Sequence, residues 1–229
     1  MRRQGRIIQH RVDTLEPVAG LLEAGVQGIE MDLTVHEGQF LAGHPIALRE
    51  RKIPFVPAQE FLQRLFGLPA ASVLIEIKAA VWNQAAQRAE FGEGELAIIL
   101  SEIEPIARLG VASEWSITFG YQNDEFIRAV RPDQLRGIPG RRIFRPKDAT
   151  EAALRSMIMV GVRNYHVMTL GHSDQRLRDL LARHRELATR LGVALGSIYD
   201  NEPGHDRILW EYFPEADFMT DNAIAFVNT

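Results

Sequence analysis

Short apolar segments alternate with longer amphipathic segments from one end of the chain to the other. Eight of the short segments are predicted as strands: 6–10, 28–34, 72–78, 114–120, 134–139, 164–170, 193–199 and 216–222. A further short segment, 39–44, follows the second strand through Glu37-Gly38, a pair suited to a hairpin turn. Strands that alternate with helices are typical of βα units around a parallel sheet. Eight such units favour a (β/α)8 TIM barrel over an open sheet.

Glycine marks the expected ends of the helices between these strands. Apolar periodic segments stop at Gly25, Gly67, Gly110, Gly161 and Gly192, and glycine is the residue that most often ends a helix. Residues 79–94 have no clear assignment. The chain shows no linker, internal repeat or low-complexity segment, so its 229 residues are predicted to form a single barrel domain, 1–229.

Composition then narrows the kinds of function. The chain has no cysteine, which excludes disulfides, thiolate nucleophiles and cysteine-based metal sites. The net charge of -4 disfavours nucleic acid as a partner, because phosphate backbones attract concentrated lysine and arginine. No apolar run approaches the about 20 residues that cross a bilayer, and no signal peptide is evident. We therefore expect a soluble, cytoplasmic protein without stable membrane insertion, and the oligomeric state is left open.

Two arginine-rich segments have less specific interpretations. The helix predicted around 176–190 carries five arginines, but its leucines make it amphipathic, which favours a solvated outer face. Residues 141–146 follow Gly140 and are predicted as a loop on the catalytic side. Binding of an anionic substrate tail and an ordinary surface loop are both open for this segment.

Acidic residues occupy one face of the second predicted strand. In 28–35 the apolar residues alternate with Glu30, Asp32 and Thr34, which places the two carboxylates on the same side. The apolar face of a barrel strand packs against the outer helices, so the acidic face points inward. Neighbouring anions inside a barrel are unfavourable unless a cation or hydrogen bonds compensate them.

The third predicted strand repeats this pattern. In 72–78, Glu76 and Lys78 share the inward face. Glu30, Asp32 and Glu76 would then meet at the carboxyl ends of neighbouring strands, where three oxygen ligands suit Mg²⁺ or Ca²⁺. The alternative interpretation is a buried ion pair between Glu76 and Lys78.

Two histidines are predicted beside these acids. His10 ends the first strand and precedes Arg11, and His44 ends the hairpin strand in Gly43-His44-Pro45. A single histidine at a strand end is more often structural than catalytic. Both, however, fall at the mouth of the predicted barrel, and phosphodiester cleavage needs one proton acceptor and one proton donor.

The order of these motifs resembles that of the glycerophosphodiester phosphodiesterase family. The motifs are Ile8-Gln9-His10-Arg11, Gly28-Ile29-Glu30-Met31-Asp32-Leu33, Gly43-His44 and Ile75-Glu76-Ile77-Lys78, all within residues 7–78. Near the other end, Thr220-Asp221 is similar to the pair that closes the family's last barrel strand. The resemblance implies hydrolysis of a small-molecule glycerophosphodiester to glycerol 3-phosphate and an alcohol. It also implies roles for the matching residues: His10 and His44 as the acid and base, Glu30, Asp32 and Glu76 as ligands of one divalent cation, and Arg11 and Lys78 as phosphate contacts.

The sequence departs from the family pattern in three places. Val12-Asp13-Thr14 follows Arg11 directly, where the family has glycine and a longer loop. Pro45 follows His44 in place of an aspartate that would orient the imidazole. The tryptophan that family members often carry on the seventh strand is not evident, and Tyr199 lies in that region.

Three other functions are open. A lipase of the sphingomyelinase D type is similar in its histidines and Glu-x-Asp motif but usually has aspartate where Glu76 stands. A metal-dependent sugar isomerase barrel would distribute its ligands over more strands and include histidine. A catalytically silent barrel would bind a phosphorylated ligand without turnover.

Overall fold

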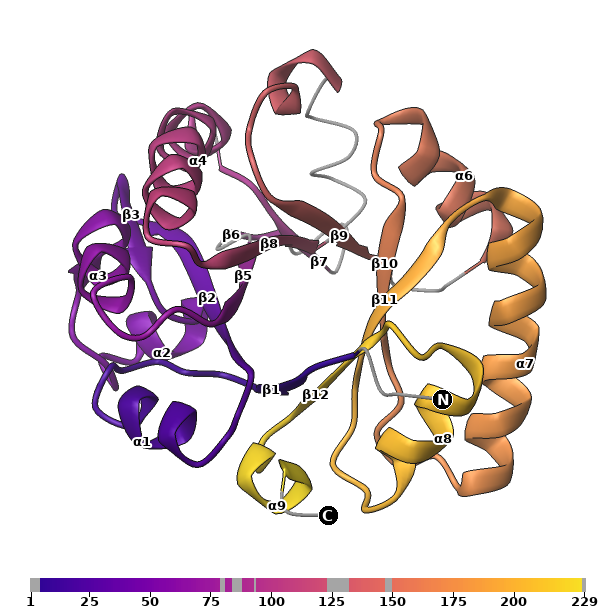
Figure 1. The fold of residues 1–229 in the computed structure, drawn as a ribbon. Helices are drawn as coiled ribbons and strands as arrows, with labels where there is room; N and C mark the ends of the chain where they lie inside the picture. The colour runs from indigo at the N-terminus through magenta and orange to yellow at the C-terminus, as the bar shows by residue number, and fades with distance from the viewer. Residues whose placement is uncertain are drawn as a thin grey trace.

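The computed structural model describes residues 5–78, 81–83, 88–92, 94–122, 132–146 and 150–227. Eight parallel strands form a closed barrel, and β1 pairs with both β2 and β12 to close it. The strands are β1 (Ile7–Gln9), β2 (Gly28–His36), β5 (Ser72–Lys78), β8 (Ser116–Gln122), β9 (Arg141–Arg145), β10 (Asn164–Met168), β11 (Ala194–Tyr199) and β12 (Asp217–Thr220). Figure 1 views this barrel along its axis, with the helices arranged around it. The predicted TIM barrel is confirmed.

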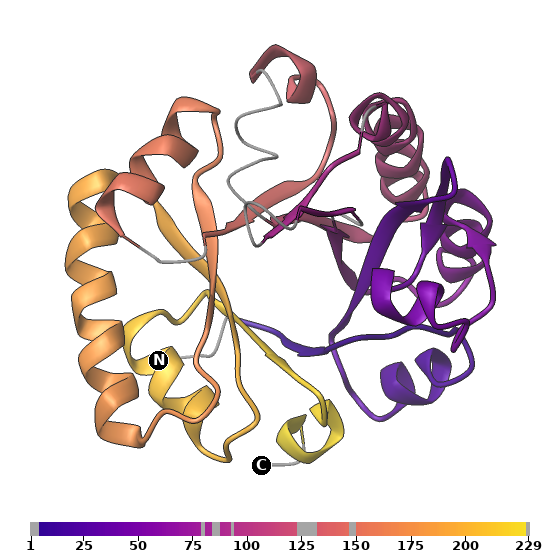
Figure 2. The same ribbon diagram turned by 180° about the vertical axis from the view of Figure 1, so that it is seen from behind.

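Helices connect the strands on the outside of the barrel, as the reverse view in Figure 2 also shows. They are α1 (Val18–Glu23), α3 (Ala58–Leu65), α4 (Glu95–Ala112), α6 (Glu151–Met159), α7 (Asp174–Leu191), α8 (His205–Tyr212) and α9 (Ala223–Val227), with a short 3-10 helix, η1 (Pro132–Leu135). Within the described ranges, no helix combines the length and apolar character that crossing a membrane requires.

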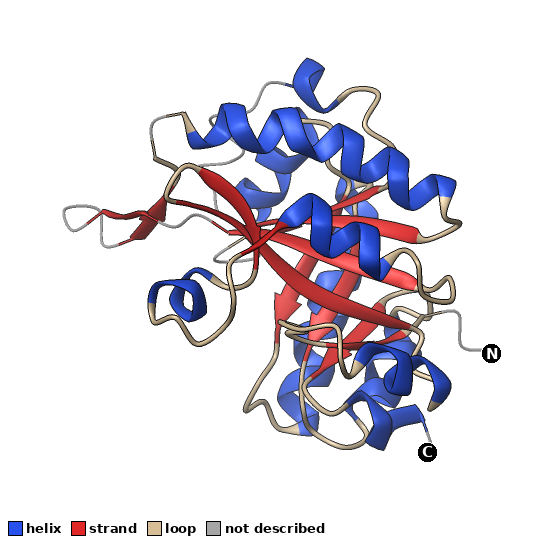
Figure 3. Cartoon of the chain, turned by 90° about the vertical axis from the view of Figure 1, so that its left-hand side faces the viewer, coloured by secondary structure: helices blue, strands red, loops and turns tan. Residues whose placement is uncertain are grey.

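Additional short elements extend the barrel at β2 and β5. The predicted hairpin strand is β3 (Gln39–Ala42), which pairs antiparallel with β2 and leads into α2 (Pro45–Arg49). A second short strand, β4 (Val56–Pro57), pairs with β3 and was not predicted. In the unassigned segment, β6 (Val81–Asn83) and β7 (Arg88–Glu90) form a separate antiparallel pair that projects from the barrel in Figure 3.

The prediction for the fifth barrel strand was wrong. Residues 134–139 contain the end of η1 and a turn, and the strand is β9, which was predicted as a loop. One face of β9 carries Arg141 and Arg145, so it lacks the apolar pattern of a strand. Arg141 nevertheless fits inside the barrel, because its guanidinium lies 3.5 Å from the Asp217 carboxylate and donates to the Gly196 carbonyl at 3.0 Å. A Cβ at Gly196 would lie 2.6 Å from the same guanidinium and from the Ile143 side chain, so a larger residue there would displace them.

The glycine predictions were largely correct. Gly25, Gly161 and Gly192 follow α1, α6 and α7 with φ of +93°, +78° and +64°. Gly110 is the exception because it lies inside α4, where it is buried against Ile117 and Phe66. Its role is close packing of the helix rather than termination.

Buried apolar side chains form two separate clusters. The larger core lies between the barrel and the helices and includes Ile29, Ile75 and Phe119. A small cluster of Ile8, Tyr199 and Met219 forms the second. Glu30, Asp32 and Glu76 of β2 and β5 are buried on the strand faces opposite the outer core, so this part of the barrel interior is polar.

The contact between α7 and β10 yields a prediction about acid stability. His184 is buried, and its Nδ1 lies 2.9 Å from the Tyr165 hydroxyl. Burial, and then Arg183, lower the pKa of His184 to about 4. The unfolded chain therefore binds more protons than the folded one between about pH 6.5 and 4. We expect this histidine to remove up to about 3 kcal/mol of stability as pH falls through that window.

The measurement is urea unfolding of the wild type and His184→Gln at pH 7 and pH 4.5. The variant should lose less stability on acidification than the wild type. Identical losses would show that His184 does not carry this dependence.

Candidate active site

Three buried carboxylates meet inside the barrel where β2 and β5 lie side by side. The strand register places Asp32 directly opposite Glu76, with Glu30 one inward position earlier on β2. Each of the three offers an oxygen within 4.8 Å of the others, and all are at most 3% exposed. The structure thus brings together all three residues that the sequence identified as candidate metal ligands.

One lysine compensates only part of this negative charge. The Lys78 ammonium hydrogen-bonds the Glu76 carboxylate and lies 3.2 Å from Asp32. The buried ion pair considered as an alternative therefore exists within the acidic cluster. Glu30 is left with a hydrogen bond from the Arg11 backbone N–H to Oε2 at 2.7 Å, while its buried Oε1 has no hydrogen-bond partner among the described residues.

The electrostatics of the cluster reflect this partial compensation. Burial, followed by repulsion from Asp32 and Glu76, raises the pKa of Glu30 well above its ordinary value. Burial also raises the pKa of Asp32, although Lys78 opposes it. For Glu76, burial is outweighed by Lys78 and Arg145, so its pKa is lowered. An unpartnered carboxylate oxygen beside two further carboxylates is the donor set that hard divalent cations prefer, so these residues fit Mg²⁺ or Ca²⁺.

His10 lies at the end of β1, where a carboxylate orients its ring. Its Nδ1 is 2.7 Å from Oδ1 of Asp221, and its Nε2 is 3.7 Å from the Glu30 carboxylate. A carboxylate accepts hydrogen bonds only, so the neutral ring carries its proton on Nδ1 and directs the Nε2 lone pair toward the acids. Burial lowers the pKa of His10, and Asp221 opposes that effect.

Asp221 is itself held from two sides. The Tyr199 hydroxyl donates to its Oδ2 at 2.6 Å, and the Asn201 side-chain amide donates to the same oxygen at 2.8 Å. The Tyr199 ring also packs on the His10 ring, with centroids 4.2 Å apart. The sequence drew attention to Asp221 and Tyr199 but assigned them no role, and it missed Asn201. Asp221 and Tyr199 contact His10 directly and orient the imidazole, and Asn201 supports this arrangement by holding Asp221.

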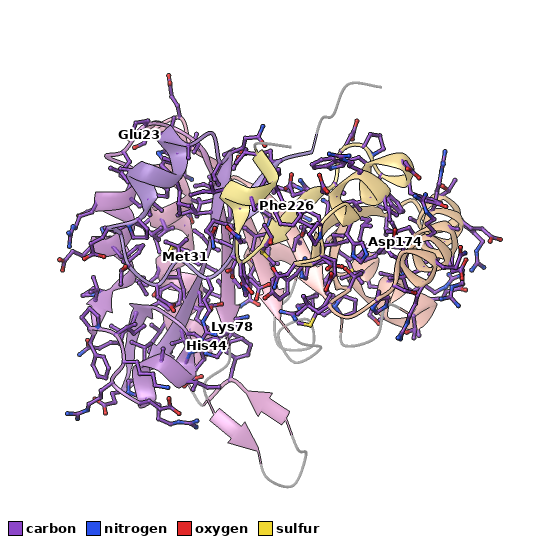
Figure 4. All side chains as sticks on the ribbon, turned by 90° about the horizontal axis from the view of Figure 1, so that it is seen from below. Glu23, Met31, His44, Lys78, Asp174 and Phe226 are labelled. Carbon is purple, nitrogen blue, oxygen red and sulfur yellow. The ribbon has the colours of Figure 1, made fainter. Side chains whose placement is uncertain are left out.

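His44 is oriented by a backbone N–H group instead of by a carboxylate. It is the N-cap of α2, and its Nδ1 accepts the Ile46 backbone N–H at 3.2 Å, so Nε2 carries the proton of the neutral ring. Pro45 occupies the first turn of α2, where proline is tolerated. Burial, and then Lys78 and Arg11, lower the pKa of His44 to about 4. Figure 4 shows His44 beside Lys78.

Arg11 and Lys78, the predicted phosphate contacts, differ in accessibility. The Arg11 side chain is 49% exposed, whereas Lys78 is buried. Arg11 has a φ of 57°, which is uncommon for a residue with a side chain and directs its backbone N–H to Glu30. Its guanidinium is thereby left at the rim of the site.

Two further groups lie near the acids, and the sequence analysis placed neither of them next to the triad. Arg145 belongs to the segment 141–146, for which binding of an anionic substrate tail was one open interpretation, and its guanidinium lies 3.7 Å from Glu76. His166 is buried on β10 and influences the pKa of Glu76. Neither has a sequence signal that links it to the first 78 residues.

Comparison with known proteins shows the fold. No protein-family model matches the chain, and no curated protein matches its sequence. The structure is similar to that of a phosphodiesterase from Oleispira antarctica in complex with its product sn-glycerol-3-phosphate, with a TM-score of 0.63, 10% identity, and coverage of 98% of this chain and 96% of that one. It is also similar to D-psicose 3-epimerase in the presence of D-fructose, with a TM-score of 0.52, 12% identity, and coverage of 96% and 89%. These likenesses establish the barrel.

Proposed function

We propose that the chain hydrolyses phosphodiesters with the help of a divalent cation, Mg²⁺ or Ca²⁺. The substrate class we favour is a glycerophosphodiester, which would give glycerol 3-phosphate and an alcohol. The observation that carries this proposal is the buried triad of Glu30, Asp32 and Glu76 next to a histidine whose Nε2 is held ready to accept a proton. The barrel's likeness to a phosphodiesterase with bound sn-glycerol-3-phosphate supports it.

The charge of the site favours a cation as well as a phosphate. The site contains four carboxylates, those of the triad and Asp221, and three cationic groups, Lys78, Arg145 and the more exposed Arg11. Such an excess of anions would repel a phosphodiester. A bound divalent cation would change the net charge of these groups from negative to positive, and it would polarise a phosphoryl oxygen.

The protein's own residues have distinct tasks in this proposal. His10 accepts a proton at Nε2 from the attacking oxygen, and Asp221 stabilises the resulting imidazolium. His44 faces the leaving oxygen with its Nε2–H. The phosphate anion opposes the effect of Lys78 and Arg11 on the pKa of His44 and so favours its protonated form. Lys78 and Arg11 neutralise charge on the phosphoryl oxygens.

The alternatives have less support. Glutamate at position 76 favours the glycerophosphodiester reaction over one of the sphingomyelinase D type. Among the described residues the only group suited to a metal is the carboxylate triad, which contains no histidine and so disfavours a sugar isomerase site. A silent binding barrel would not need the three side chains that orient His10.

Turnover of model substrates tests the proposal. Pure protein would be incubated with bis(p-nitrophenyl) phosphate and a panel of glycerophosphodiesters, with Mg²⁺, Ca²⁺ or a chelator. We expect turnover that the chelator removes, and a fall in kcat of about 10³-fold in His10→Ala because general base catalysis is lost. A His10→Ala melting temperature near that of the wild type excludes unfolding as the cause. Stabilisation by these ligands without turnover would instead indicate a binding protein.

A further inference from the structure

Arg145 differs from the other arginines that pair inside the barrel. Arg6 forms two hydrogen bonds to the Asp217 carboxylate, at 3.0 and 2.7 Å, and Arg141 contacts the same carboxylate and a backbone carbonyl. Arg145 has weaker partners: Nη1 lies 3.7 Å from Glu76, and Nη2 donates to the Met168 thioether at 3.8 Å. Sulfur is a weak acceptor, so most of the guanidinium's donors remain available in the part of the chain that the structure describes.

The burial of Arg145 makes the weakness of its partners significant. Its side chain is only 18% exposed, so its charge is partly removed from water without strong hydrogen bonds in return. Such a charge is unfavourable unless an anion compensates it. The Glu76 carboxylate gives part of that compensation, but Lys78 hydrogen-bonds the same oxygen of Glu76. A cation held by the triad would compete with Arg145 for the negative charge of Glu76.

A second polar group in this region is also incompletely bonded. His166 is 1% exposed, and its Nδ1 lies 2.9 Å from the Ser197 hydroxyl. Its Nε2 is buried and has no hydrogen-bond partner among the described residues. Burial, followed by Arg145, lowers the pKa of His166 to about 3, so the ring is neutral. Buried ring nitrogens without partners are rare and indicate a place for a further polar group.

The side chains around Glu76 indicate which polar group would occupy this place. Lys78 from β5 and Arg145 from β9 approach the same Glu76 oxygen, so two cationic groups flank one point of the interior. We propose that Arg145 binds the phosphate of the substrate, opposite Lys78, and that the free Nε2 of His166 hydrogen-bonds the same ligand. A guanidinium presents paired donors that match two phosphate oxygens. This inference rests on the proposed function and adds Arg145 to the phosphate contacts.

Two substitutions at position 145 separate this role from simple support of Glu76. Arg145→Lys keeps a positive charge but loses the paired donors, and Arg145→Gln loses both. The matched control is Arg155→Gln, because Arg155 is 62% exposed on α6 and pairs only with Glu151 among the described residues. The readouts are kcat and KM for bis(p-nitrophenyl) phosphate, and the Kd of inorganic phosphate by calorimetry in saturating Mg²⁺.

We expect Arg145→Gln to raise both KM and the phosphate Kd by about tenfold or more, as for loss of a charge-assisted hydrogen bond. Arg145→Lys should have an intermediate Kd, and Arg155→Gln should match the wild type. A merely structural role for Arg145 would lower the melting temperature and leave the Kd of phosphate unchanged. An Arg145→Gln protein that is folded and binds phosphate within twofold of the wild type would overturn the inference.

The phosphate measurement does not require turnover, so the two proposals can fail separately. If the wild type cleaves no diester and Arg145→Gln binds phosphate more weakly than the wild type, the hydrolase proposal is contradicted and the anion site is supported. If the wild type cleaves diesters and Arg145→Gln binds phosphate as tightly as the wild type, the hydrolase proposal is supported and the anion site is contradicted. A wild type that binds no phosphate at all would also overturn the inference.

Discussion

Glu30→Gln is expected to slow turnover severely and yet to make the metal-free protein more stable. Glu30 is fully buried, one of its oxygens has no partner among the described residues, and two other carboxylates are nearby. An amide in its place removes a cation ligand together with an unfavourable charge. We expect a fall in kcat of about 10³-fold or more and, at pH 8 in chelator, a gain in unfolding free energy on the order of 1 kcal/mol.

The pH dependence provides an independent check. Because the pKa of Glu30 is raised in the folded protein, the folded state binds more protons than the unfolded state above about pH 4.5. The metal-free wild type should therefore lose stability through this residue as pH rises toward that higher pKa. Glu30→Gln should lack this loss, so its advantage over the wild type should grow with pH.

Melting temperatures with and without Mg²⁺ or Ca²⁺ complete the test. A cation at about one hundred times its Kd should stabilise the wild type by about 3 kcal/mol, and Glu30→Gln should lose most of this gain. Glu60→Gln is the matched control, because Glu60 is exposed in the first turn of α3. Equal stabilisation of Glu30→Gln and the wild type by either cation would place the metal elsewhere.

The triad could be predicted from sequence because strand geometry fixes which side chains share a face. Alternation in β2 and β5 places Glu30, Asp32 and Glu76 on the inward side once a closed barrel is assumed. In-register pairing of β2 and β5 then brings them together. Only the identity of β2 and β5 and the closure of the barrel were needed. The alternation that identifies these two strands is local, whereas closure was inferred from the number of predicted strands.

The fifth strand could not be predicted from a local pattern. Its inward face carries Arg141 and Arg145, which are favourable inside only because Asp217, Gly196 and Glu76 lie near them. Those partners belong to other strands, so the segment alone resembles a surface loop. Long-range ion pairing here outweighs the apolar periodicity on which strand prediction depends.

The residues that orient His10 were missed for a similar reason. Asp221 is 211 positions from His10 in the chain, and the two meet because the closed barrel pairs β1 with β12. The Thr220-Asp221 motif suggested the last strand but not the partner of its carboxylate. The shortened loop after Arg11 also proves compatible with an ordered site, since Val12 donates its backbone N–H to the Glu30 carbonyl at 2.8 Å.

Asp221→Asn is expected to reduce kcat by about a hundredfold or more with little change in KM. Tyr199 and Asn201 both donate to Oδ2 of Asp221, so the amide oxygen of the variant should occupy that position. The amide nitrogen must then face Nδ1 of His10 and donate to it. This moves the ring proton to Nε2 and removes the lone pair that accepts a proton in the reaction.

The pH profile of kcat/KM distinguishes this loss from general damage to the site. The Asp221 carboxylate raises the pKa of His10 against the effect of burial, so its removal should shift the acidic limb to lower pH. A structural defect would lower activity at all pH values without moving that limb. Asp179→Asn is the matched control, because Asp179 lies on α7 in an exposed pair with Gln175. If Asp221→Asn retained wild-type kcat and the same acidic limb, the histidine at position 10 would not depend on Asp221 for its tautomer.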